Sequence, residues 1–289
     1  MQPPRHNPRA TITPPAMPRL PLLLLSMTLA LPAHGDGPAP RWRQGWGLAA
    51  AGTTEGDIGH DASFARLTLQ RRAGGHEAWG RNLLAGPVQV RLRNDGEGTA
   101  TTVPVLLPAG EQRRLLWLAD DGGPVSLLLD AFPGDPSAHP VDHLYRLPFD
   151  GVPVRVSQGI GGHHSHGNAQ NRYAIDFPLP EGTPVLAARA GTAMQVVADS
   201  PEDGCLVRVL HADGSMALYA HLQSGSLSVR PGQAIQAGQP LARSGNTGHS
   251  SGPHLHFAVQ ANTGLALASI PFRMAGPQGE LRFPRTLEP

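Results

Sequence analysis

Short runs in which apolar and polar residues alternate recur along the chain from about residue 61 onward. In the segment PVQVRLRND, Val88, Val90 and Leu92 alternate with polar residues, the period-2 pattern of a half-buried strand. Residues 101–132 predict three further strands, separated by the turn sequences PAGE and DDGG. Short strands at this spacing predict a small β-sandwich in the N-terminal half of the chain.

A second series of strand signals runs from residue 152 to about residue 260, and it has almost no helical periodicity. The predicted strands are YAIDF, TPVLAA, TAMQVVA, LVRVLH, MALYAHL and HLHFAV, with turn sequences such as PEG, EDG, ADG and RPGQ between them. The 35 Gly and 30 Pro residues agree with many short strands joined by turns. The chain is therefore predicted to be all-β, with an N-terminal sandwich and a C-terminal β-sheet domain.

Changes in composition give the expected domain boundaries. The segment FPGDPSAHPVDHLYRLPFDG is dense in Pro and Asp and is typical of a linker. We expect a signal peptide at 1–35, a β-rich domain with an exposed leader at 36–131, the linker at 132–151, the C-terminal domain at 152–262 and a tail at 263–289.

The first 35 residues have the pattern of a secretory signal. Arg5, Arg9 and Arg19 precede an apolar run at 20–31, which is shorter than the roughly 20 residues that span a bilayer. Cleavage after small residues at 33 or 35 predicts an exported protein, periplasmic or extracellular, with no membrane span afterwards. The alternative is an uncleaved anchor.

Charge and cysteine content exclude several other classes of protein. The formal net charge of +1 gives no electrostatic bias toward nucleic acid or acidic membranes. Cys205 is the only cysteine, so no internal disulfide can form. Since no histidine is expected to pair with it, Cys205 is more typical of a buried residue than of a nucleophile.

The clearest candidate chemistry is in the strand sequence HLHF. On a strand, His254 and His256 project to one face, while Leu255 and Phe257 project to the other. Two adjacent imidazoles suit a metal site in which one ring binds the ion and the other acts on water. Taken alone, the pair is as typical of two exposed or hydrogen-bonded histidines.

Other metal-binding side chains lie before this strand. In RYAIDF, Asp176 shares a strand face with Ala174, and a buried carboxylate there would need a partner such as a cation; the alternative is an exposed or turn-capping Asp. Further histidines occur in GGHHSHG, upstream of Asp176, and in LYAHL, where Tyr219 and His221 are expected to share a face: His163, His164, His166 and His221.

Zinc is the metal that this set of residues suits. A catalytic zinc site takes nitrogen and oxygen ligands from three protein side chains and keeps one position open. His166, Asp176 and His256 are the candidate ligands, which leaves His254 and His221 for roles beside the metal. Because the chain has no HExxH sequence, a histidine is expected to carry the proton.

Residues 154–260 resemble the lysostaphin/LytM-type zinc peptidases, the M23 family. The resemblance rests on YAIDFPLPEGTPVLAARAGTA and on LYAHLQSGSLSVRPGQAIQAGQPLARSGNTGHSSGPHLHF. It implies a β-sheet groove that holds zinc, and cleavage of peptide cross-links or glycyl bonds in bacterial peptidoglycan. It also implies that Asp176 and His256 bind the metal, and that His254 and His221 orient or deprotonate the water and stabilise the tetrahedral intermediate.

The sequence departs from the family pattern at one ligand. The common H-x-G-x-D run would place the first histidine four residues before the aspartate, where this chain has Arg172. SHGNAQNRYAIDF instead resembles a variant subgroup with a loop inserted before the strand that carries the aspartate. This resemblance favours His166 as the first ligand, with His164 and His163 as alternatives.

Other functions fit parts of the sequence. A catalytically inactive family member would bind wall or activate another hydrolase through an unidentified regulatory partner, although such members usually lose ligands. VRPGQAIQAGQPLARSG resembles carrier barrels, but the chain has no Lys to carry a cofactor. A structural zinc site would need a fourth protein ligand.

Overall fold

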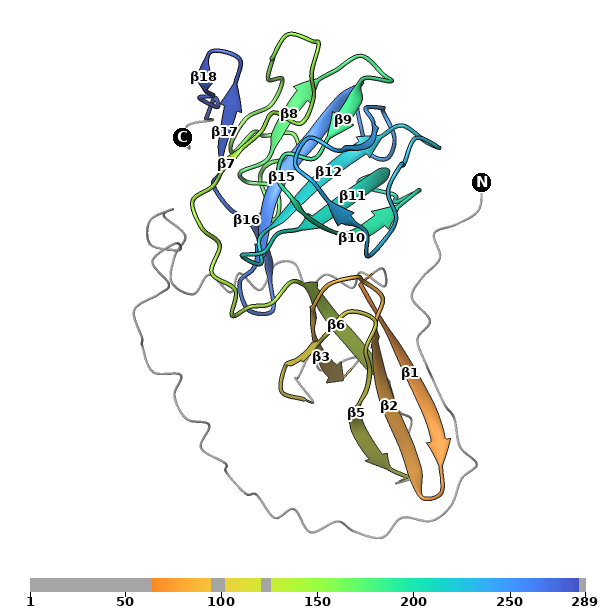
Figure 1. Cartoon of the computed structure of the whole chain (residues 1–289). Helices are drawn as coiled ribbons and strands as arrows, with labels where there is room; N and C mark the ends of the chain where they lie inside the picture. Colours follow the sequence, from red (N-terminus) through yellow and green to blue (C-terminus); the bar gives the residue numbers. More distant parts are fainter. Residues whose placement is uncertain (1–63, 95–101, 121–125, 286–289) are drawn as a thin grey trace.

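The computed structural model describes residues 64–94, 102–120 and 126–285, and every regular element in this part of the chain is a β-strand (Figure 1). The strands are β1 Ala65–Arg72, β2 Gly75–Asn82, β3 Val88–Asn94, β4 Val105–Leu107, β5 Gln112–Ala119, β6 Leu127–Pro133, β7 Leu144–Tyr145, β8 Ile175–Pro178, β9 Pro184–Leu186, β10 Gly191–Val197, β11 Cys205–Leu210, β12 Met216–Leu222, β13 Ala234–Ile235, β14 Pro240–Arg243, β15 His254–Asn262, β16 Leu267–Ser269, β17 Arg273–Gly276 and β18 Gly279–Glu280. The predicted all-β class is confirmed.

The expected signal peptide (1–35) and leader lie outside the described residues. Among the residues that are described, no helix has the length and apolar character needed to cross a membrane.

The N-terminal half consists of two three-stranded sheets, with strand orders β1-β2-β5 and β4-β3-β6. Both sheets contribute to one hydrophobic core, since Ala65 and Ala78 of the first sheet cluster with Val88, Val90 and Leu92 of the second. The apolar face predicted for β3 is thus confirmed, although Gln89 and Arg93 on its other face are buried as well, so the strand is not half-buried. The two sheets form the predicted sandwich.

The C-terminal half is built on a seven-stranded sheet. Its strand order is β13-β10-β11-β12-β15-β16, and β8 pairs with β15 outside this path. Leu255 and Phe257 are fully buried in the largest core, together with Ile175, Phe177 and Tyr219. This core fixes one face of β8, β12 and β15, so the alternate residues of β8 and β15 project to the opposite face.

The segments expected to be a linker (132–151) and a tail (263–289) are packed against this sheet. Tyr145 and Phe149 are buried in the largest core, and β7 pairs in parallel with β17. Both segments therefore contribute strands and core residues to the C-terminal fold, through residue 285.

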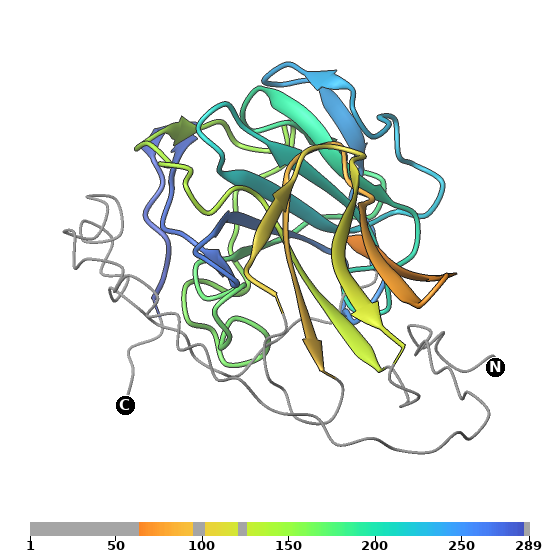
Figure 2. The same ribbon diagram turned by 90° about the horizontal axis from the view of Figure 1, so that it is seen from below.

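The two halves share a second core rather than meeting only at a flexible joint. Met194 and Met216 of the seven-stranded sheet, with Leu267, cluster with the apolar residues of the N-terminal sandwich. The Asn262 side-chain amide donates a hydrogen bond to the Gly134 carbonyl at 3.1 Å. Figure 1 shows the N-terminal strands below the larger sheet, and in Figure 2, seen from below, they lie in front of it.

Candidate metal centre

The centre forms where β8, β12 and β15 lie side by side. β15 pairs antiparallel with β8, and this register sets His256 directly opposite Asp176. On its other side β15 pairs with β12, where Ala220 is opposite His256. A small residue beside the two polar side chains leaves room above the sheet for a third group.

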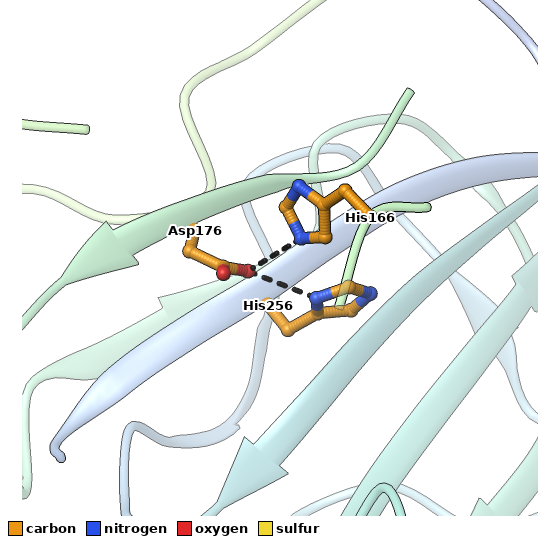
Figure 3. A group of neighbouring side chains, drawn as sticks. All are labelled: His166, Asp176 and His256. Atoms are coloured by element: carbon orange, nitrogen blue, oxygen red, sulfur yellow. Dashed lines mark hydrogen bonds and ion pairs between the residues drawn. The ribbon is translucent and has the colours of Figure 1, made fainter. Parts of the chain in front are cut away.

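That third group is His166, from the loop that precedes β8. One ligand atom from each of His166, Asp176 and His256 can be chosen so that all three lie within 4.8 Å of one another. Oδ1 of Asp176 is 3.2 Å from Nε2 of His166 and 2.9 Å from Nδ1 of His256 (Figure 3). All three residues are buried, with His166 at 0% exposure. His163 and His164 are exposed and do not belong to this group.

The hydrogen bonding of His166 fits a bound cation. Its Nδ1 is 2.8 Å from the carbonyl oxygen of Gly159, which can only accept, so Nδ1 carries a proton. In the neutral ring Nε2 therefore presents a lone pair, and it faces a second acceptor, Oδ1 of Asp176. Two acceptors at this distance need a proton or a cation between them. With its nitrogen and oxygen donors, this arrangement fits zinc.

Asp176 is held in its charged form. Burial of the carboxyl raises its pKa, but hydrogen bonding to His166 and His256 outweighs burial, and the pKa of Asp176 falls well below its ordinary value. The carboxylate is therefore ready to bind a cation throughout the neutral pH range.

Two further histidines lie beside this group. The ring centroids of His221 and His254 are 4.6 Å apart, and that of His221 is 5.9 Å from that of His256. Nε2 of His254 is 3.9 Å from Oδ1 of Asp176. All five histidine and aspartate residues expected at the site are thus brought together.

Backbone carbonyls fix the orientation of both outer rings. Nδ1 of His221 donates to the Thr247 carbonyl at 2.9 Å, and Nδ1 of His254 donates to the Gly252 carbonyl at 2.8 Å. In the neutral rings Nε2 is then unprotonated and able to accept a proton. Burial, followed by the nearby His256 and His254, lowers the pKa of His221 to about 4, so this ring is neutral at pH 7.

His221 departs from the alternation expected of its strand. Tyr219 is buried in the largest core beside Phe257, whereas His221 lies with the histidines on the opposite face of the sheet. The prediction that Tyr219 and His221 share a face is therefore wrong. The cause is a left-handed backbone at His221, with φ of 58°, next to an irregularity in the pairing of β11 with β12.

Two polar residues at the site were not anticipated from the sequence. Gln158 donates from its side-chain amide to Oδ2 of Asp176 at 3.0 Å. Thr247 Oγ1 donates to the Leu222 carbonyl at 2.6 Å and accepts from the Cys205 amide at 2.9 Å. Neither has a distinctive motif; the only signal is that Gln158 precedes GGHHSHG and Thr247 lies in the turn before HLHF.

The chain is similar to known peptidases over this region. Residues 170–267 match the family model described as Peptidase family M23. An uncharacterized metalloprotease of Haemophilus influenzae is 35% identical over 126 residues, which are 43% of this chain and 26% of the relative. The peptidoglycan DD-endopeptidase ShyA of Vibrio cholerae is 30% identical over 149 residues, 50% of this chain and 32% of ShyA. The catalytic domain of a mutant of the M23 protein EnpA from Enterococcus faecalis is 26% identical, with 43% of this chain and 92% of that chain covered at a TM-score of 0.36.

The two curated relatives match this chain over only part of their length. The chain spans 26% and 32% of the two curated relatives, so their full-length activities are not carried over with the match. The family match includes Asp176, His221, His254 and His256, and it begins after His166. Residues 170–267 are therefore a domain of peptidase family M23.

Proposed function

We propose that this protein is a zinc-dependent endopeptidase that hydrolyses peptide bonds of bacterial peptidoglycan. The observation that carries the proposal is the convergence of His166 Nε2, Asp176 Oδ1 and His256 Nδ1 on one buried point. Relatives named for this activity support the substrate class: ShyA is a peptidoglycan DD-endopeptidase, and ALE-1 of Staphylococcus capitis is a glycyl-glycine endopeptidase.

In this proposal His166, Asp176 and His256 hold the ion. Three protein ligands leave one coordination position open, as catalytic zinc sites require and structural sites do not. Zinc bound there would supply a Lewis acid for the scissile carbonyl and lower the pKa of water toward about 7. The hydrogen bond from His166 to Gly159 would keep the proton on Nδ1 and leave Nε2 free as a ligand.

His254 and His221 move or hold protons in this mechanism. Nε2 of His254 lies close to Oδ1 of Asp176 and accepts the proton of the attacking water, while Nδ1 stays bonded to Gly252. The protonated ring then donates to the leaving amine. His221, which is neutral at pH 7, accepts a hydrogen bond through Nε2 and orients the same water. It can donate to an oxyanion only after it gains a proton.

The proposal also covers where the protein acts. A peptidoglycan substrate requires export, in agreement with the signal pattern at 1–35, and one relative is named a lipoprotein. We therefore propose that the protein acts in the cell envelope, periplasmic or extracellular. The N-terminal sandwich would lie beside the peptidase domain there and be available to a regulatory partner or to the wall.

Digestion of purified peptidoglycan tests the function. Zinc-loaded protein should release fragments with new free amino and carboxyl ends, identified by mass spectrometry, and chelator-treated protein should release none. The position of the new ends would identify the bond. If zinc-loaded protein binds the metal at one ion per chain but leaves every peptide bond intact, the chain is an inactive regulator and the proposal is wrong.

A further inference from the structure

Gln158 occupies a central position in the loop that carries His166. Its side-chain Nε2 donates to Asp176 Oδ2 at 3.0 Å and to Ser165 Oγ at 2.8 Å. Its Oε1 accepts from the backbone N–H of His164 at 3.1 Å. The contacts with Asp176 and His164 fix the orientation of the amide, because a carboxylate can only accept and a backbone N–H can only donate; the Ser165 hydroxyl, which can do either, accepts in this orientation.

The backbone of Gln158 is fixed to the same strand. The amide of Asp176 donates to the Gln158 carbonyl at 2.9 Å, which forms an isolated β-bridge between these residues. The backbone of Gln158 is therefore held beside Asp176. From there its side chain reaches the turn that carries His166. One side chain therefore contacts Asp176 directly and also the two residues that precede His166 in the chain.

The two carboxylate oxygens of Asp176 have different partners. Oδ1 faces His166 and His256, whereas Oδ2 accepts from Gln158. A carboxylate without the second contact could rotate and present either oxygen, or both, to an ion. Hydrogen bonding of this kind to ligating carboxylates and histidines typically changes metal affinity by 10- to 100-fold.

We infer that Gln158 is a positioning residue for the metal site, which fixes Asp176 through Oδ2 and holds the His166 loop against β8. This inference rests on the proposed function, because it concerns the same ion. It accounts for how a histidine ten residues before the aspartate, on a loop rather than on the strand, is kept at ligand distance.

The first test is zinc affinity of the full chain, measured by competition with a chromophoric chelator. Gln158→Met keeps a side chain of similar length without the amide, and it should weaken zinc binding by 10- to 100-fold. The matched control is Gln239→Met: Gln239 is also half-buried, and its amide oxygen accepts from the Gln236 N–H at a turn away from the site. The control should bind zinc as the wild type does.

Cobalt substitution separates positioning from general loss of structure. A changed carboxylate orientation should alter the visible absorption of the cobalt-loaded Gln158→Met protein, while Gln239→Met should keep the wild-type spectrum. An affinity within threefold of the wild type, or an unchanged spectrum, would overturn the inference while leaving the proposed function intact. Wild-type protein that binds no zinc would overturn both.

Gly162 provides a second and independent perturbation. A Cβ added at this buried position would collide with Cγ and Cδ of the Gln158 side chain, so Gly162→Ala should displace the amide and weaken zinc binding. In a Gln158→Ala background the obstructing atoms are gone, and Gly162→Ala should have little further effect. Additive losses in the double variant would contradict the inference, because position 162 would then act without Gln158.

Discussion

At the scale of single residues, ring orientation decides the chemistry of the candidate site. His166, His221 and His254 each donate from Nδ1 to a backbone carbonyl, and Nε2 of His166 and of His254 lies toward Asp176. His256 is reversed, with Nδ1 at Asp176. All four side chains are imidazoles with the same chemistry. The place and orientation of each ring therefore decide whether it binds the ion or accepts a proton.

Substitution of the two histidines of HLHF should separate these roles. His254→Ala should keep one zinc per chain and reduce hydrolysis by at least about 100-fold, the usual contribution of a general base. His256→Ala should lose the zinc, because only two ligands remain. Metal content by atomic emission and turnover of a peptidoglycan peptide provide the two readouts. Equal zinc content in the two variants would show that the division of roles is wrong.

A buried histidine outside the site should make the free energy of unfolding fall in acid. Burial is the main cause that lowers the pKa of His211 from 6.5 to about 4, and its ring donates to the Ala190 carbonyl at 2.8 Å. At pH 7 the ring is neutral in both the folded and unfolded states. Below pH 6.5 the unfolded chain binds the proton first, so this residue lowers the free energy of unfolding until the folded ring also titrates near pH 4.

His211→Leu tests that contribution. The variant should lose about 1 kcal/mol at pH 7 with the Ala190 hydrogen bond. Its free energy of unfolding should then fall less between pH 6.5 and 4, by up to about 3 kcal/mol relative to the wild type. Denaturant unfolding at a series of pH values measures both effects. Parallel pH profiles for the two proteins would contradict the assignment.

At the scale of elements, the alternation of apolar and polar residues correctly predicted which side chains of β15 and β8 face the core. It failed for His221 at the end of β12. Leu255 and Phe257 are buried in the core on one face and His256 lies on the other, as period-2 patterning requires. The left-handed backbone at His221 has no counterpart in the pattern. The bulge depends on contacts with distant parts of the chain, such as the bond from the His221 amide to the Asp203 carbonyl.

The turn before β15 is a second element whose role the sequence did not reveal. Thr247→Val keeps the shape of the side chain but removes both hydrogen bonds of Oγ1, leaving the Cys205 N–H and the Leu222 carbonyl without that partner. We expect a loss of about 2 kcal/mol in the free energy of unfolding. Hydrolysis should also fall, since the Thr247 carbonyl orients His221.

The control is Ser228→Ala, which removes one hydrogen bond from an exposed hydroxyl to the Pro240 carbonyl. That variant should change stability by less than about 0.5 kcal/mol. If Thr247→Val is as stable as this control, the turn does not depend on Oγ1.

At the scale of the whole molecule, the site and the contact between the two halves occupy one face of one strand. His254, His256, Gln260 and Asn262 alternate along β15, with the histidines at its start and Asn262 bonded to Gly134 at its end. The distance from His256 to Asn262 along a strand is about 20 Å. The peptidase domain and the sandwich are thus parts of one packed structure.

The shared core predicts that both halves unfold together. Met216 is fully buried among residues of the sandwich, so Met216→Ala should cost about 2–5 kcal/mol. Calorimetry should give one transition for the wild type and one transition at lower temperature for the variant. Two separate peaks, with only one shifted by the substitution, would mean that the halves are independent.

The sequence alone predicted which residues form the candidate site better than it predicted how the loop and the two halves of the chain pack together. The paired histidines and the strand aspartate have recognisable local patterns, and these patterns together with the family resemblance indicated Asp176, His254 and His256 as candidates. The choice of His166 over its neighbours depended on a family resemblance. No local pattern encodes the bond of its ring to the Gly159 carbonyl, or the bond of the neighbouring His164 amide to Gln158. The shared core of the two halves also depends on residues far apart in the chain.

In the proposed metal centre, one ion is held by side chains from three separate segments of the chain. A crystal of zinc-loaded protein, measured on both sides of the zinc absorption edge, tests it most directly. We predict one anomalous peak at about 2.0–2.2 Å from His166 Nε2, Asp176 Oδ1 and His256 Nδ1. No peak there, or a peak bound by other residues such as His163 or His164, would contradict the account.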